Sequence, residues 1–354
     1  MKYLALLIPL ILLAHPARSG TIVDSKLLTS LRNYYTNNTR LAAVRAELEV
    51  FEEFRDRIPA ISIWIGKRTS PLSTLVSIGI EPSGEKSLLE YANSVLNCER
   101  RRTRRDLHIK LVEYARLRQV LEIGNEQMSW IETLATNLES RSQFHPLHAK
   151  LMAIQNRRDD HRNHLMTMTN DLATMEVSIR RLLGDSNHLI GEYELQLSRP
   201  TKPFVADKNL LALASLRNPD LKVANALVRF AGPTPNAIRA LLVARAEEID
   251  SQLPESMAGL TSIMDSSERL ARSLREERLI RQEEAIALAR AGVESGRITL
   301  ADLISHHLEL AGSRIRYLNA LAAHHRALSE LLFICGIDSV ESLRILMTKH
   351  KGTD

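Results

Sequence analysis

The feature that most constrains this chain is a pair of apolar stripes running side by side through residues 303–332. One stripe starts at Leu303 and the other at Ile304, and in both the next members follow at alternating steps of four and three residues. That rhythm is typical of a helix that packs along its whole length, as in a coiled coil. Two stripes one residue apart form a face about 100° wider than a single stripe. The pattern therefore predicts a long helix covered on two sides by other helices.

The second of these stripes is a candidate contact between copies of the chain. Its members include Ile304, Leu308, Ile315 and Leu318. One neighbouring helix cannot cover both stripes, and soluble proteins rarely leave so large an apolar face exposed. We therefore expect the chain to form an oligomer through this seam.

The sequence also carries an internal duplication. The tetrapeptide SLRN begins at Ser30 and again at Ser215, 185 residues later, whereas two similar helix endings at Gly184 and Gly336 are 152 residues apart. Residues 20–184 and 210–336 are thus expected to be tandem repeats, joined by a linker at 185–209 and followed by a tail at 337–354. The difference between the two offsets makes the second repeat 33 residues shorter.

Most of the missing length corresponds to residues 59–82. There, apolar residues alternate with polar or small ones in two runs, which predicts a short β-hairpin. The second repeat has only residues 232–236 at that place. With 44% apolar but only 4% aromatic residues, the fold class we expect is all-α, with long antiparallel coiled-coil helices in two repeats, returns near Phe144 and Gly296, and at most that one hairpin.

The N-terminus has the pattern of a secretory signal peptide. Lys2 precedes an apolar run from Leu4 to Ala14, and small residues up to Ser19 suggest cleavage, so residues 1–19 are assigned to the signal. A membrane anchor is the alternative, but the run is shorter than the roughly 20 residues that a spanning helix needs. Two distant cysteines, Cys98 and Cys335, are expected to be free and buried.

Two short motifs predict helix starts and turns. Asn218 is a good N-cap, Pro219 suits the first helical position, and Asp220 faces the positive end of the helix dipole. Gly296 can adopt a positive φ at a helix end, and Thr299 can cap the helix that follows.

These features together resemble the outer-membrane efflux proteins, the TolC-type ducts, and most closely their heavy-metal cation branch. The run Asn218-Pro219-Asp220-Leu221 is similar to the family's repeat opening, and Gly296, Arg297, Asp302 and Leu303 are similar to its hairpin tip. The resemblance implies a homotrimeric duct in the bacterial cell envelope, in the periplasm or outer membrane, that exports small solutes or metal cations. It also implies that the tip docks on a periplasmic adaptor, which connects to an inner-membrane pump.

The sequence departs from that family at the membrane end. In the family each protomer gives four strands to a membrane barrel, but this chain offers two strand candidates, or six per trimer, whereas membrane barrels have at least about eight strands. A periplasmic helical scaffold or binding protein that does not span the membrane is therefore the main alternative. A basic coiled-coil protein that binds nucleic acid would require the signal peptide to be false, so we expect no nucleic-acid partner.

No motif indicates an enzyme, a cofactor or a metal centre. A phosphate-binding glycine loop, a nucleophile elbow and a zinc-type cysteine cluster are all missing from the sequence. The pairs His145 with His148 and His161 with His164 are too far apart on one helix to share a metal, and His307 and His324 fall in the first stripe as packed residues. Five arginines within residues 100–105 form either a solvated helix face or a contact with anionic lipid.

Overall fold

The structure is a computed structural model that describes residues 85–140, 145–183, 197, 209–230 and 236–337. In chain order the helices are α6 (Glu85–Glu139), α7 (His145–Leu183), α8 (Asn209–Arg217), α9 (Pro219–Phe230), α10 (Asn236–Ser273), the π-helical turn η2 (Leu274–Leu279), α11 (Ile280–Glu294) and α12 (Leu300–Ile334). None of the described residues is in a strand, and the prediction of long antiparallel helices is confirmed. The expected signal peptide at 1–19, the hairpin at 59–82 and the tail from 338 onward lie outside the described residues.

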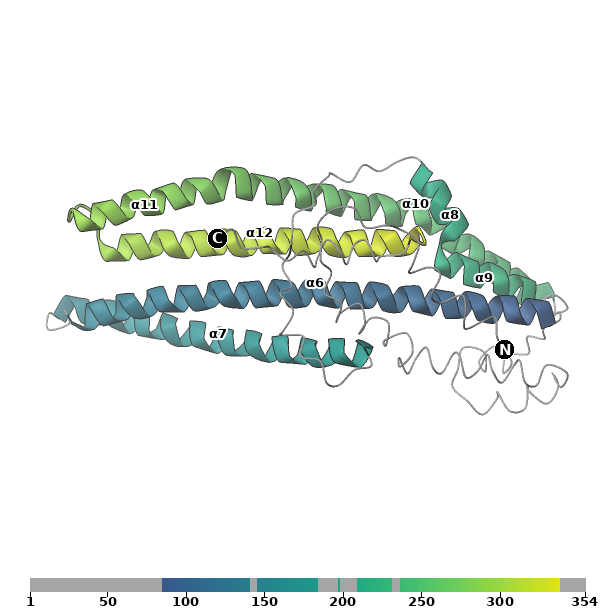
Figure 1. Cartoon of the computed structure of the whole chain (residues 1–354), viewed down its shortest axis with the longest axis horizontal. Coiled ribbons are helices and arrows are strands. Elements are labelled where there is room, and N and C mark those ends of the chain that lie inside the picture. Colours follow the sequence, from purple (N-terminus) through teal and green to yellow (C-terminus); the bar gives the residue numbers. More distant parts are fainter. Residues whose placement is uncertain (1–84, 141–144, 184–196, 198–208, 231–235, 338–354) are drawn as a thin grey trace, which may run out of the picture.

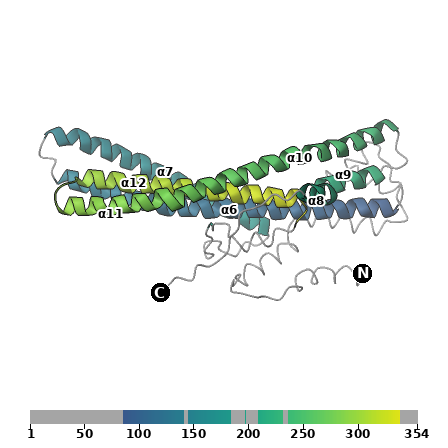
Figure 2. The same ribbon diagram turned by 90° about the horizontal axis from the view of Figure 1, so that it is seen from above.

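The long helices form two antiparallel hairpins that lie side by side (Figure 1). In one hairpin α6 returns as α7, and in the other the continuous rod of α10, η2 and α11 returns as α12. Because α6 packs on α12, the order across the molecule is α7, α6, α12 and then α10 with α11. Seen from above, α7 diverges from α12 toward the hairpin ends, and α10 diverges at the opposite end (Figure 2). The 55 residues of α6 correspond to about 82 Å of helix.

The contact between α6 and α12 forms the main core. On α6 it buries Leu107, Leu111 and Val112, and on α12 it buries Leu321 and Ala322. This contact also contains a buried polar pair, in which Nδ1 of His108 meets Oγ of Ser329. The same hydroxyl donates to the His325 carbonyl oxygen at 2.8 Å. A satisfied polar pair in an apolar contact favours one register of the two helices over others.

Both stripes of α12 are covered within the chain. The first stripe packs on the other rod: Leu331 joins Leu253 and Met264 of α10, and Leu310 joins Ile286 of α11. The second stripe faces α6, where Leu318 joins the main core. The prediction that this helix is covered on two sides is therefore confirmed.

The capping predictions are also confirmed. The side-chain oxygen of Asn218 accepts from the Leu221 backbone N–H at 2.9 Å, and Pro219 opens α9. Thr299 caps α12. At the other end of α12, Gly336 has a φ of 60° and donates to the Phe333 carbonyl, while Ile337 donates to that of Leu332. That pair of bonds is the Schellman arrangement, which satisfies two carbonyls that the helix leaves free.

The π-helical turn changes the rhythm of the buried residues along the rod. Before the turn, Met264, Ser267, Ala271 and Leu274 follow one another at steps of three and four; after it, Leu279, Gln282, Ile286 and Ala289 do the same. The step across the turn, from Leu274 to Leu279, is five residues. A π-helical turn accommodates one extra residue, so α10 and α11 both keep their inner face toward α12.

Candidate functional site

The outer face of α7 carries an exposed stripe with coiled-coil spacing. Its members, at steps of four and three, are Met152, Asn156, Asp159, Asn163, Met166, Asn170, Ala173 and Val177, and all of them are exposed. The opposite face of the helix holds Met168 and Ile179, which are buried in the core with α6. Consequently, α7 has a second packing face that the described part of the chain leaves open to solvent.

The opposite edge of the molecule has a stripe of its own on α10. Gly259, Ile263, Ser266, Leu270 and Ser273 follow the same spacing and are all exposed, whereas Met264 and Ala271 on the inner side are buried. Beyond the π-helical turn, Ile280 and Leu288 continue the exposed apolar surface with 50% and 74% exposure. Small residues here leave room for another helix to approach closely around the Ile and Leu side chains.

Two different stripes on opposite edges can join copies of the chain edge to edge. A contact between unlike surfaces is heterologous, and it closes into a ring when the rotation between copies allows it. The α7 stripe contains asparagine at 156, 163 and 170, once every seven residues. Asparagine at a coiled-coil core position fixes the register of the partner at a cost in stability.

The tip of the second hairpin is built by local hydrogen bonds. Gly296, with a φ of 73°, donates to the Val293 carbonyl, and Arg297 donates to that of Gly292, which ends α11 in another Schellman arrangement. The Asp302 carboxylate accepts from the backbone N–H and the hydroxyl of Thr299 at 3.2 and 2.7 Å. These hydrogen bonds hold the pKa of Asp302 below its ordinary value. The turn is therefore rigid.

Three of the four expected tip residues are accessible. Gly296, Arg297 and Asp302 are exposed at the end of the hairpin. Leu303 is 6% exposed and packs with Ile286 inside the hairpin. Within this group, Leu303 thus supports the tip from below, while the other three residues form its surface.

The expected oligomer seam faces inward. Ile304 and Leu318 are buried at 1% and 8% exposure, and Ile315 packs against the core that α6 and α12 share. Leu308 is half-buried and lines a groove beneath α7. Contact between copies through these four residues would require α6 to move away, so their assignment to a trimer seam stays a prediction.

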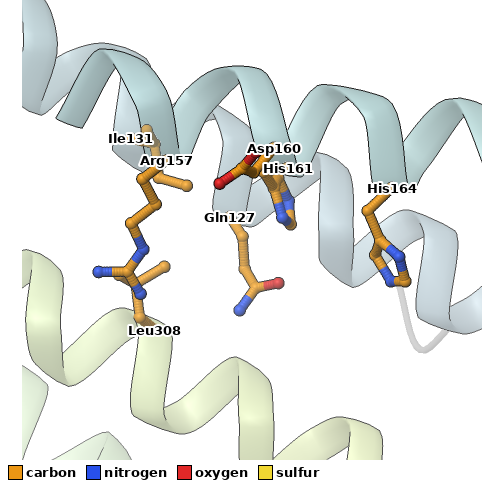
Figure 3. A pocket seen from close by; sticks show the side chains of 7 residues that line it. All are labelled: Gln127, Ile131, Arg157, Asp160, His161, His164 and Leu308. Atoms are coloured by element: carbon orange, nitrogen blue, oxygen red, sulfur yellow. The ribbon is translucent and has the colours of Figure 1, made fainter. Parts of the chain in front are cut away.

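That groove, of about 270 Å³, lies between α6, α7 and α12 (Figure 3). Leu308 and Ile131 give it an apolar part, and Gln127 and Arg157 point into it. The His161 ring lies over the α6 backbone, with Nε2 2.8 Å from the Gly124 carbonyl oxygen. A side chain at residue 124 would crowd this approach, since a Cβ there would lie 2.6 Å from the Leu165 side chain.

A second groove on the α11 side contains an aromatic stack. The rings of Trp130 and His307 lie 3.8 Å apart with an angle of 18° between their planes. Arg314 of α12 pairs with Glu126 of α6 at 3.2 Å and with Glu283 of α11 at 3.7 Å. This arginine therefore joins the two hairpins near their free ends.

The histidines form no metal centre in the described part of the chain, where no group of three or more His, Cys, Asp or Glu residues could hold an ion. His307 and His324 are packed as expected, and His324 is 2% exposed with Nδ1 3.3 Å from the Met264 carbonyl oxygen. The side chains of His145 and His148 lie outside the described residues. Cys98 and Cys335 are both free and buried, as predicted, and burial is the main cause that raises the pKa of Cys98 to about 12.

The arginine run on α6 ties helices together. Arg102 pairs with Asp220 at the start of α9, and Arg105 pairs with Glu330 of α12 at 3.3 Å. The Arg105 guanidinium also lies 4.7 Å from the centre of the Phe333 ring. These contacts are a third role, which neither a solvated face nor a lipid contact describes.

Comparison with known proteins places this architecture. No family model matches the sequence, and no curated protein matches it either. Solved structures do match: the outer-membrane channel OprN has a TM-score of 0.63 at 13% identity, covering 89% of this chain and 91% of that one. The open-state MtrE channel of Neisseria gonorrhoeae gives 0.57 at 12%, covering 88% and 89%. VceC of Vibrio cholerae gives 0.56 at 12%, covering 88% and 96%.

This chain has the fold of the outer-membrane efflux channels. The resemblance that the sequence suggested is thereby confirmed for the fold, and identities of 12–13% do not distinguish the heavy-metal branch from the others. No helix among the described residues is both long and apolar enough to cross a membrane. With the efflux-channel fold established, the two exposed edges are the surfaces by which one protomer would meet the next.

The sequence reasoning missed the α7 stripe. Its signal was present in the spacing of four and three residues, but asparagines and an aspartate occupy half of its positions. A search for apolar residues alone therefore passes over it. The recurrence of asparagine every seven residues is the pattern that would have found it.

Proposed function

We propose that this chain is the protomer of an efflux duct in the bacterial cell envelope, a homotrimer that carries small solutes outward. The single observation that supports this proposal best is the pair of exposed stripes on opposite edges of an efflux-channel fold. In the proposed ring, the outer face of α7 on one copy packs against α10 on the next. The helices of three copies would then enclose a common channel.

The second part of the proposal concerns partners. The exposed tip at Gly296, Arg297 and Asp302 is the surface that would dock on a periplasmic adaptor, which in turn would connect the duct to an inner-membrane pump. A rigid, capped turn suits this role because little conformational entropy is lost when it binds. Cargo could include metal cations, since the sequence resembles the heavy-metal branch, but the described residues hold no such ion site.

Sedimentation of the full mature chain in detergent tests the ring. Met166→Glu, at 64% exposure on the α7 stripe, and Ile263→Glu, at 47% on the α10 stripe, should each abolish the trimer. Leu216→Glu, at 73% exposure on α8, is the matched control and should leave it intact. Mixing the first two variants should give dimers that do not grow, because each mixed pair keeps one intact edge contact. A wild-type chain that sediments as a monomer at high concentration would overturn the proposal.

A cysteine at Arg297 tests the tip. The two native cysteines are buried at 3% and 1% exposure, so a thiol-reactive crosslinker should attach at position 297 first. Crosslinking in cells should then capture the adaptor, whereas a cysteine at exposed Arg275, on the π-helical turn, should not.

One observation favours the alternative, a periplasmic scaffold that does not span the membrane. Only residues 231–235 separate α9 from α10, and a crossing strand alone needs about 9 to 11 residues. Cell fractionation distinguishes the two functions. Extraction by detergent alone supports the duct, whereas release by osmotic shock supports the scaffold.

A further inference from the structure

Three arginines lie together where α8 and α12 end against the middle of α6. Arg101 and Arg104 are one turn apart on α6, and Arg217 is the last residue of α8. Burial, and then the positive charges of Arg104 and Arg217, lower the pKa of Arg101. We call these three residues the arginine junction.

The junction has an excess of positive charge. The neighbouring Arg102 and Arg105 are paired with Asp220 and Glu330. Arg101, in contrast, has a buried guanidinium nitrogen for which the structure shows no hydrogen-bond partner. A buried donor without a partner costs about 1–3 kcal/mol, and more when it is charged. An anionic group is therefore expected at this place.

The C-terminal tail leaves the described structure beside the junction. Gly336 packs so tightly on α8 that a Cβ there would lie 2.2 Å from the Arg217 carbonyl oxygen. Asp338 is the next residue but one, and Glu341 follows three residues later. Two extended residues reach about 7 Å, which brings an Asp338 carboxylate within range of Arg217.

We propose that the tail, residues 338–354, docks on the arginine junction through the carboxylates of Asp338 and Glu341. Two carboxylates then face three guanidinium groups, and the end of α12 is latched to both α6 and α8. The linker is a weaker candidate because its acid closest to α8, Asp207, precedes the start of that helix. Arg217 is at the far end of α8, about 12 Å away along the axis. This inference does not depend on the proposed efflux function.

Limited trypsin digestion of the full mature chain tests the latch. The tail contains Arg344 and Lys349, and mass spectrometry can follow the loss of the fragment beyond either residue. Arg101→Gln and Asp338→Asn should each accelerate that loss about tenfold, because cleavage follows the population of undocked tail. The double variant should be no faster than either single one, since both remove the same interaction. Arg275→Gln, at an exposed position on η2, is the matched control and should leave the rate unchanged.

A vesicle assay separates the tail from an outside anion. The wild-type chain should not bind phosphatidylglycerol vesicles through the junction, whereas the Asp338→Asn/Glu341→Gln chain should bind them, and adding Arg101→Gln should abolish that binding. Equal vesicle binding by the wild-type chain and the double carboxylate variant would overturn the proposal in favour of a lipid site. Unchanged digestion in both Arg101→Gln and Asp338→Asn would overturn it as well.

Discussion

The contact between α6 and α12 and the outer face of α7 share one spacing but differ in composition. The first is lined by Leu, Val and Ala with a single buried His–Ser pair, and the second carries three asparagines and an aspartate among its eight positions. Spacing shows that both faces are made for another helix. Composition indicates what kind of partner is expected: apolar faces pair within the chain, and mixed faces pair between copies.

The physical reason lies in what each contact must overcome. Helices of one chain are already connected, whereas separate copies lose translational and rotational freedom worth about 4 to 15 kcal/mol on association. A protomer must also remain soluble before it assembles, so an edge as apolar as the main core would promote aggregation. The asparagine-bearing stripe gives up affinity for solubility and a fixed register.

The largest difference should appear when a leucine is truncated on each side of this comparison. Leu321→Ala, at 1% exposure in the α6–α12 contact, should lower the free energy of unfolding by about 2–5 kcal/mol because it leaves a cavity. Leu288→Ala, at 74% exposure on α11, should change it by less than about 0.5 kcal/mol in the monomer. Urea unfolding of monomeric protein measures both, and similar values would contradict the division into core and edge.

Replacing asparagine on the α7 stripe should strengthen assembly. Asn163→Leu removes a polar group from the proposed contact, so the dissociation constant of the oligomer should fall about tenfold. Thr167→Leu, on α7 beside the stripe, provides the control and should have little effect. Sedimentation equilibrium measures the constants. Weaker assembly of Asn163→Leu would mean that this asparagine makes a hydrogen bond the contact needs.

Two glycines in helices should respond in opposite directions. Gly124→Ala places a Cβ 2.6 Å from the Leu165 side chain in the α6–α7 contact, so Leu165 must shift and stability should fall by about 1 kcal/mol. Gly259→Ala, with nothing within 4 Å on the outer edge, should raise the stability of the monomer by about 0.5–1 kcal/mol. Thermal unfolding distinguishes them, and the same sign for both would show that one environment is misassigned.

The smallest effect should be a pH dependence at the Trp130–His307 stack. Burial, then the charges of Arg290 and Arg314, lower the pKa of His307, although Glu126 acts in the opposite sense. The unfolded chain, with an ordinary pKa of about 6.5, then binds a proton more readily than the folded one. The stabilisation is complete above that value and is lost as the pH falls through the folded pKa.

Melting temperatures between about pH 7.5 and pH 5 test this dependence. The wild-type chain should lose more stability over that range than His307→Gln, which cannot titrate. Glu283 pairs with Arg314 nearby, so Glu283→Gln controls for a change in local charge and should keep the wild-type slope. Equal slopes for wild type and His307→Gln would contradict the prediction.

The sequence predicted those parts of the fold that local chemistry determines. Asn218, Gly296 and Thr299 act within a few residues of their own position, so their caps and turns could be recognised without a structure. The stripes of α12 were recognised for the same reason. Their spacing, however, is the same whether the partner helix belongs to the same chain or to another copy. The assignment of Ile315 and Leu318 to an oligomer seam therefore rested on a distinction that spacing alone does not contain.

The candidate site depended more on contacts between distant residues. Arg102 and Asp220 are 118 residues apart, and no local pattern joins them. The Trp130–His307 stack likewise depends on which two helices meet. At the tip, local motifs predicted the turn correctly, but the inward direction of Leu303 follows from packing against Ile286 of the opposite helix.

The π-helical turn Leu274–Leu279 makes the second hairpin more than a straight rod. Each extra residue in a helix advances the following side chains by about 100°. If the turn moved along the rod by one exchange of hydrogen bonds at a time, the residues it passed would rotate as on a screw, while both ends of the rod stayed in place. The rod thus contains a rotary joint, by which the side chains facing a neighbour can change without unfolding either hairpin.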